Sequence, residues 1–507
     1  MKSGKLFLFA SLFSSSVLFA QNDDDALRYS MLTFGGSARS MGMGGAFGAL
    51  GADLSTLSTN PAGLGFYRKN EILFTPGLVT SRTETDFLGS TTPQTKYNFN
   101  LTNAGIALTG KLGHTYRLDE EKTPEWKSIA FGFAVNRLAN FSSRFSYSGF
   151  NPDNSLLDSY LQKINSGAGI EPTNLTDAFP FDAGLAYQAY LINPISGDSM
   201  HYNSVIPSGN IQQDFSKTST GGLTEYALSL AANYDDHLFI GGTIGLPVIH
   251  YHSSSTYSES DKNDSIPDFI NYVLTNDTRT SGEGVNVKFG LIYRVNDNFR
   301  LGVAAHSPTF YSMRDNYSSA ITSDFSSSGK IESSSPDGKF NYTLSTPWRL
   351  IGSMAFVFPN YGLISVDYEW LDYSQANFAF DQSGNSGDQS IASAINQTIE
   401  KKYTAAANLR VGGELSLGIF RVRAGFGTAA TPFTGNYATP NASYAVKNIS
   451  AGLGVREKNY FIDLGYVYSA TNRFYQPYAL TSPVEFVPGA SSSLNMSNMV
   501  MTVGWKF

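Results

Sequence analysis

Hydrophobic and polar residues alternate with a period of two along most of the chain. In the segment 494–507, one face carries Met499, Met501, Val503, Trp505 and Phe507, and the other face carries smaller or charged residues. This alternation is typical of β-strands with one apolar face. It predicts about fourteen strands, at 70–84, 97–112, 126–149, 221–234, 237–257, 282–295, 298–316, 339–358, 361–374, 402–417, 419–431, 445–456, 459–472 and 494–507.

The connections between these predicted strands alternate between short and long. Turns such as 234–237 and 295–298 are tight, whereas the connection at 113–125 is the one longer exception on that side. Short periplasmic turns, long exterior loops and an even strand number are typical of outer-membrane barrels. The long polar stretches are 150–220, which is the longest, 258–281, 317–338, 375–401 and 473–493.

Charged residues occupy one face of several predicted strands. Arg410 alternates with leucine and valine, and Arg421 and Arg423 alternate with Phe420 and Val422. An Arg or Lys facing lipid near the bilayer centre costs about 2–4 kcal/mol, so these charges belong on the lumen side. Arg410, Arg421 and Arg423 are therefore candidate lumen contacts for a ligand carboxylate. The alternative is that they pair with the acidic residues Asp367, Glu369 and Glu414.

Composition narrows the class of protein further. The 507 residues carry a net charge of −7, and charged residues make up only 15%, so no basic field favours nucleic acid. Cysteine is absent, which excludes disulfides and thiol catalysis. The chain is therefore predicted to be all-β: a transmembrane antiparallel β-barrel with an N-terminal hatch.

The N-terminus indicates export. Residues 1–20 contain Lys2 and Lys5, then an apolar run that ends at Ala20, which is typical of a secretory signal peptide. No later apolar run is long enough for a membrane helix. We therefore predict a signal peptide at 1–20, a hatch at 21–69 and a barrel at 70–507.

Three stretches within the long loops have apolar residues at helical spacing. They lie at 156–164, at 266–274 and at 391–399. The first two follow candidate capping residues, and all three predict short amphipathic helices near the outer rim.

The segment from Ala38 to Phe66 is rich in Gly, Ala and Met and almost free of charge. A dinucleotide-binding loop is a poor interpretation, because Phe47 replaces the third glycine of the motif and no strand precedes it. A polar lumen also offers no ordinary core for these apolar residues. The remaining interpretation is a plug within the barrel, whose flexible Met and Gly residues suit variable apolar ligands. The predicted ligand-binding residues are Phe34, Met41, Met43, Phe47, Leu50, Leu54 and Leu57.

The segment GGSARSMGMGGAFGALGADLSTLSTNPAGL closely resembles the hatch of the FadL/OmpP1/TodX family of outer-membrane transporters, including the motif Asn60-Pro61-Ala62. The stretches 287–311 and 346–374 resemble strands of that family, and the lead-in DALRYSMLTFGG resembles its Bacteroidetes-type branch. The resemblance implies fourteen strands, a plugged lumen and a side opening at an inward kink of the third strand. The predicted third strand, 126–149, carries no Pro or Gly pair that marks a kink.

The resemblance implies an outer-membrane transporter for hydrophobic or amphipathic small molecules such as fatty acids. The ligand would be captured at the exterior loops, held above the hatch and released sideways or through the hatch. Outer-membrane lipids surround such a barrel, and the C-terminal Phe507 fits the signal read by the barrel-assembly machinery. The alternative is a barrel that does not transport and instead docks envelope proteins in a secretion or assembly complex.

An enzyme in the barrel wall is a third interpretation, carried by His250-Tyr251-His252. This pattern places two imidazoles on one strand face, but no carboxylate pattern accompanies them, and metal centres need more ligands. We therefore expect no enzyme activity, no metal and no cofactor.

Overall fold

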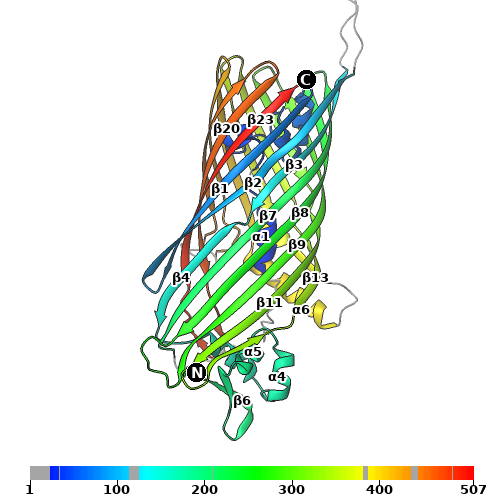
Figure 1. Cartoon of the computed structure of the whole chain (residues 1–507). Helices are drawn as coiled ribbons and strands as arrows, with labels where there is room; N and C mark the ends of the chain where they lie inside the picture. The colour runs from blue at the N-terminus through cyan, green and yellow to red at the C-terminus, as the bar shows by residue number, and fades with distance from the viewer. Residues whose placement is uncertain are drawn as a thin grey trace, which may run out of the picture.

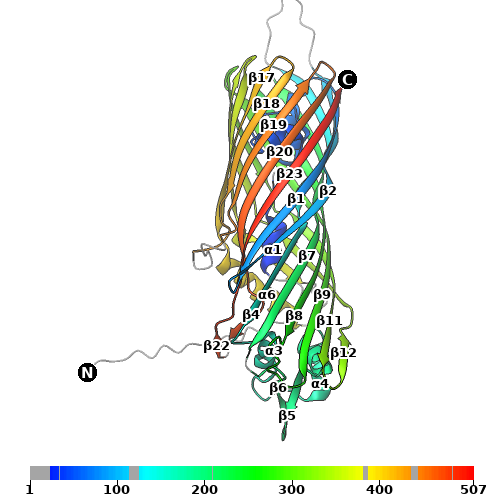
Figure 2. The same cartoon turned by 60° about the vertical axis from the view of Figure 1, so that its left-hand side comes forward.

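The structure is a computed structural model that describes residues 23–33, 35–112, 125–207, 209–380, 386–435, 443–481 and 483–507. The chain forms a closed antiparallel barrel of 14 strands, as predicted, and β1 closes the barrel by pairing with β23 (Figures 1 and 2). The predicted signal peptide, 1–20, lies outside the described residues.

The barrel wall is built from strands in sequence order. Their bounds are β1 Glu71–Phe87, β2 Ser90–Lys111, β3 Trp126–Asn140, β4 Ser143–Asn151, β7 Ile211–Tyr234, β8 Leu238–Ser260, β9 Phe269–Arg294, β10 Phe299–His306, β11 Phe310–Phe325, β12 Gly329–Ser334, β13 Gly338–Ser345, β14 Arg349–Phe358, β15 Gly362–Asp372, β16 Asn377–Phe380, β17 Ala405–Leu417, β18 Phe420–Ala429, β19 Val446–Arg456, β20 Tyr460–Tyr475 and β23 Ala490–Lys506. Small hairpins pair β5 (Ile192–Ile195) with β6 (Asp198–Ser204) and β21 (Leu480–Thr481) with β22 (Val484–Glu485).

Several strands are longer than a membrane requires. β7, β8 and β9 have 24, 23 and 26 residues, whereas about 9–11 residues cross a bilayer. The predicted loops 258–281 and 317–338 were therefore wrong, because most of their residues continue the wall. The helix predicted at 266–274 was also wrong, since β9 begins at Phe269 and a bulge opposite Phe325 mimics helical spacing.

Two predicted strands are each divided at a proline. The segment 298–316 breaks between β10 and β11 at Pro308, and 339–358 breaks between β13 and β14 at Pro347. Proline has no N–H to donate to the strand ladder, which explains both breaks.

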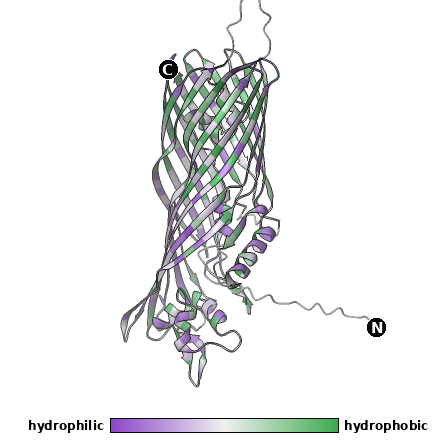
Figure 3. Ribbon diagram, turned by 90° about the vertical axis from the view of Figure 1, so that its right-hand side faces the viewer, coloured by the Kyte–Doolittle hydropathy of each residue, from purple (hydrophilic) through white to green (hydrophobic). Residues whose placement is uncertain are grey.

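The outward face carries a band of exposed apolar side chains in the half of the wall that includes the short turns. Figure 3 shows hydrophobic residues concentrated there and hydrophilic ones along the strands beyond it. Phe289 is 66% exposed and Leu453 is 59% exposed. An exposed apolar band flanked by aromatic residues is typical of a surface that faces lipid.

The described N-terminal residues, from Asp23 on, lie inside the barrel, and residues 35–69 lie in this half of it. They form α1 (Asp23–Ser30), α2 (Ala38–Gly42), η1 (Leu54–Ser58) and η2 (Pro61–Phe66), and α2 contacts β18, β19, β20 and β23. We call the described residues 31–69 the hatch; α1 precedes it and lies farther from the short turns (Figure 1).

The long connections cover the other end. α3 (Leu156–Ile164), α4 (Pro172–Ala178) and α5 (Ala183–Gln188) form a cap, and α6 (Ser386–Lys402) lies beside β16 after the short η3 (Tyr373–Gln375). The helices predicted at 156–164 and 391–399 are thus confirmed. No helix within the described ranges is long and apolar enough to cross a membrane.

Candidate functional site

The hatch packs against the wall through the apolar residues that the sequence singled out. Each described member of that set is at most 1% exposed and belongs to one of three apolar clusters. The clusters join Leu54 and Leu57 to β3 and β7, join Met43, Phe47 and Leu50 to Ala355, and join Met41 to Val467 and Val500. The expectation that the lumen offers no core was wrong, because the wall turns small and apolar residues inward here. Phe34 lies outside the described residues.

Wall glycines make room for the hatch backbone. A Cβ added at Gly412 would lie 2.2 Å from the carbonyl oxygen of Met43, and one at Gly290 would lie 1.9 Å from Oδ1 of Asn60. A Cβ at Gly241 of β8 would meet Pro61 at 2.5 Å. Any larger residue at these positions would push the hatch away from the wall.

Polar groups of the wall satisfy the hatch backbone. The carboxylate of Asp367 on β15 accepts N–H bonds from Phe47 at 2.9 Å and from Gly48 at 2.9 and 3.1 Å. Asn60 donates from Nδ2 to the carbonyl of Gly48 at 2.6 Å and accepts from the N–H of Ala62, so the motif Asn60-Pro61-Ala62 caps η2. The motif therefore fixes the shape of the hatch.

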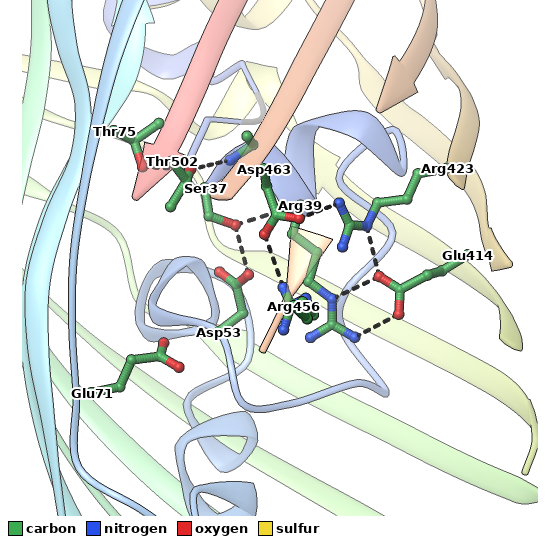
Figure 4. A network of polar contacts seen from close by, with 12 residues as sticks. Ser37, Arg39, Asp53, Glu71, Thr75, Glu414, Arg423, Arg456, Asp463 and Thr502 are labelled. Carbon is green, nitrogen blue, oxygen red and sulfur yellow. Dashed lines mark hydrogen bonds and ion pairs between the residues drawn. The ribbon is translucent and has the colours of Figure 1, made fainter. Parts of the chain in front are cut away.

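A network of buried charges links α2 to the wall (Figure 4). Arg39 of α2 pairs with Glu414 at 3.1 Å, and Arg423 pairs with both Glu414 and Asp463 at 2.6 Å. Asp463 also forms an ion pair with Arg456 at 3.0 Å. Breaking one member would leave uncompensated charge in the barrel interior, which is strongly destabilising.

The three candidate arginines therefore have different environments. Arg423 is fully buried in the network, and Arg410 pairs with Glu369 at 2.6 Å. Arg421 instead donates to the carbonyls of Gly418 and Phe420 at the turn before β18. The alternative that these arginines pair with acidic residues therefore holds for Arg410, which pairs with Glu369, and for Arg423, which pairs with Glu414.

Beyond the hatch, α1 packs within an apolar cluster of lumen side chains, and we call the part of the lumen that this cluster fills the chamber. Leu27 and Tyr29 of α1 join a cluster that includes Tyr251, Met313 and Tyr342 from the wall. The guanidinium of Arg28 lies 4.5 Å from the ring centre of Tyr251. The α6 residue Lys402 pairs with Asp23 and Asp24 of α1. The side chains around α1 are therefore mainly aromatic and aliphatic, and α1 packs directly against them.

The third strand is interrupted beside the hatch. Residues 126–149 divide into β3 and β4, and the pairing of β2 with β3 ends at Asn103 and Asn136. In the described part of the chain, no ladder joins residues 90–102 of β2 to β4, which pairs with β7 instead. We call this break, between residues 90–102 and 137–151, the seam.

Side chains bridge the seam where the backbone ladder stops. Asn140 donates to Asn98 at 3.0 Å, and Gln94 donates to Ser146 at 2.8 Å. The β2 residue Phe99 pairs in register with Leu78, which also pairs with Met499. The seam therefore begins at the level of the outward apolar band. The asparagines that β2 and β3 carry beside the seam are the one feature of the sequence that marks its position.

A small cavity connects the seam to the hatch and the charged wall. It measures about 40 Å³ and is lined by hatch residues Leu32 and Thr33, by Asn136 and Leu138 of β3, and by Arg410. Its volume suits a few water molecules. His306 and Arg349 also line it; the sequence reading missed both, because neither has a motif around it.

The two histidines on β8 have different surroundings. His252 contacts Asp277 at 2.6 Å and His250 is exposed on the outer face. Among the described residues, no three His, Asp or Glu side chains are grouped to hold a metal ion.

Comparisons with known proteins support the architecture. No protein-family model and no curated protein matches the sequence. Among solved structures, the toluene transporter TodX of Pseudomonas putida aligns with 94% of this chain and 99% of its own, at 12% identity and a TM-score of 0.52. A FadL homologue of Pseudomonas aeruginosa aligns with 94% and 99%, at 11% identity and a TM-score of 0.53. The chain therefore has the fold of the FadL and TodX transporters, a 14-stranded barrel with N-terminal segments inside it.

Proposed function

We propose that this protein is a bacterial outer-membrane channel for hydrophobic or amphipathic small molecules, which leave it sideways through the seam. The single observation that carries the proposal is the break in the β2–β3 ladder, directly beside the hatch. A continuous wall would force any ligand past the charged network, which strongly disfavours apolar molecules. A break at the level of the apolar band offers a route into the membrane instead.

The route follows three regions in order. A ligand enters the chamber that α1 occupies, where aromatic and Met side chains replace its water. It then reaches the small cavity above the hatch. Arg410 and Arg349 line this cavity, and both pair with Glu369, at 2.6 and 2.7 Å. The cavity of about 40 Å³ would have to widen for a fatty acid to pass, and its carboxylate would compete with Glu369 for the two guanidinium groups. The seam is the exit, because only side chains bridge it.

The hatch residues Met41, Met43, Phe47, Leu50, Leu54 and Leu57 contact the wall in this structure. They contribute to ligand binding only if the hatch shifts during passage. The closed hatch keeps polar solutes out while ligand leaves at its side. The shared fold with TodX, a toluene transporter, supports the same function.

The seam is tested by closing it. The chain has no cysteine, so Asn98→Cys with Asn140→Cys introduces a single pair that a short thiol cross-linker can join. With the pair joined, uptake of oleate by cells should fall to the level of cells without the barrel, and cleaving a disulfide-containing linker should restore it.

The matched control joins Tyr468→Cys and Ser497→Cys, which are register partners in the continuous wall between β20 and β23. This cross-link should leave uptake unchanged. Unchanged uptake with the seam joined would exclude lateral release. If the protein supports no oleate uptake and instead copurifies with envelope proteins in fixed proportion, the docking alternative replaces transport.

A further inference from the structure

A second site lies outside the barrel, between α6 and β16. The groove there measures about 840 Å³, within the range of about 300–1,000 Å³ typical of ligand sites. One wall is a stripe of α6 that includes Gln389, Ser393 and Gln397, and the other wall is the outer face of residues 375–379. Its floor includes Phe378, Ala392 and Asn396.

Asn396 gives the groove a fixed shape. Its side chain accepts the N–H of Phe378 at 2.8 Å and donates to the carbonyl of the same residue at 2.8 Å. These two bonds occupy the backbone groups of β16 that face α6. A peptide strand therefore cannot add to β16 at Phe378, since β-augmentation needs a free strand edge.

The chemistry of the lining points to a hydroxyl-rich ligand. Gln375, Asn377, Gln389 and Gln397 are exposed and each offers both a donor and an acceptor. Among the described residues that line the groove, Glu400 is the one charged side chain and none is a cation. This lining favours neutral sugar hydroxyls over phosphate, which cationic side chains would recognise.

The position of the groove supports the same ligand. On β15, Tyr368 and Trp370 face outward and are 52% and 38% exposed, at the outer edge of the apolar band. Aromatic residues mark the lipid–water boundary of such barrels. The groove begins four residues after Trp370, at Ser374, where the sugars of an outer-leaflet glycolipid would lie. This placement rests on the outer-membrane location proposed above.

We propose that the groove between α6 and β16 binds a neutral glycan, presented by a glycolipid of the outer leaflet. The exposed residues of the groove form the proposed site, whereas its floor residues Phe378 and Ala392 also belong to the apolar cluster around α1. We place the site outside the transport route because its polar lining is exposed on the outer surface.

The test measures binding of two probes to the purified full-length barrel in detergent. One probe is core oligosaccharide released from lipopolysaccharide and freed of both its phosphates and its acidic inner sugar, and the other is intact lipopolysaccharide. Gln397→Leu with Asn377→Leu removes two amides from facing walls and should weaken both probes. Each lost hydrogen bond costs about 1 kcal/mol, so we expect roughly tenfold to thirtyfold weaker binding.

The matched control is Thr398→Leu, an exposed α6 residue outside the groove, which should bind both probes as the parent does. Binding of the oligosaccharide shows that sugars suffice, whereas binding of intact lipopolysaccharide alone assigns the site to membrane-held glycan. The proposal is overturned if neither probe binds, or if both bind the double variant as tightly as the parent. Oleate uptake by the double variant should equal that of the parent, so failure of the transport proposal would be seen separately.

Discussion

The two ends of the lumen are held together by different forces. Around the hatch, buried charges dominate: Arg423 pairs with Glu414 and Asp463 in a fully enclosed site. Toward the cap, aromatic packing dominates: the rings of Phe215 and Tyr475 stack at 5.0 Å, and those of Tyr147 and Phe215 at 5.3 Å.

This difference separates a rigid region from an adaptable one. Charge pairs are directional, and moving one partner leaves the other unpaired at high cost. Apolar contacts are non-directional and survive repacking of similar volume. We therefore expect the hatch network to stay fixed while the aromatic packing toward the cap rearranges around ligands.

The largest effect should come from breaking the network. Arg423→Leu leaves Glu414 and Asp463 short of a partner and should lower the free energy of unfolding by about 3–5 kcal/mol, measured by urea unfolding in lipid vesicles. Arg421→Leu, on the same strand but at the exposed turn, should change it by less than about 0.5 kcal/mol. Equal effects of the two substitutions would show that the network does not hold this end of the barrel.

A smaller effect should follow from crowding the hatch. Gly412→Val places atoms against the carbonyl of Met43 and should cost about 1–3 kcal/mol. It should also let a small polar dye leak through barrels in vesicles. Gly352→Val is the control, because a Cβ there meets nothing within 4 Å. If the Gly412→Val barrel leaks no more dye than the parent, the close approach of hatch and wall at this position is contradicted.

The cap offers a pH-dependent test. Asp158 accepts the N–H of Ser155 at 2.8 Å at the start of α3, and its burial raises its pKa from the usual 3.8 to about 6. The folded cap thus favours the protonated carboxyl. The contribution of this protonation to the stability of the cap is fully present below about pH 4. It decreases between about pH 4 and pH 6, and the stability stays level at higher pH.

Asp158→Asn should therefore stabilise α3 by about 1–2 kcal/mol at pH 8 and have little effect at pH 4, as read by hydrogen exchange of residues 156–164. Asp153→Asn, at an exposed position of the same connection, should leave the exchange unchanged at both values. If Asp158→Asn stabilises α3 equally at pH 4 and pH 8, the charge of Asp158 is not the cause of the effect.

The smallest effect should come from the link between α6 and α1. Lys402 pairs with Asp23 and Asp24 while about a fifth of its side chain is exposed (22%). Lys402→Gln should cost about 0.5–1 kcal/mol and speed hydrogen exchange in residues 23–30. Lys401→Gln serves as the neighbouring control. Unchanged exchange in residues 23–30 would show that packing alone holds α1.

The sequence by itself determined the barrel. Alternation of period two, sorted loop lengths and inward charges on β15, β17 and β18 predicted the strand number and the faces, because lipid penalises charge at every outward position. These are local patterns that repeat along the chain. Strand ends were harder to place, since polar alternating segments outside the membrane look like loops.

Only the tertiary structure decided how the lumen is filled. Met43 contacts Gly412, Asp367 binds Phe47, and Asn98 contacts Asn140 across large sequence separations, so no local pattern records these pairs. The third-strand break has the same origin: β4 pairs with β7 and leaves β2, a choice set by competing partners in three dimensions. Periodicity reports which face a residue occupies; which residue lies opposite depends on how the barrel closes.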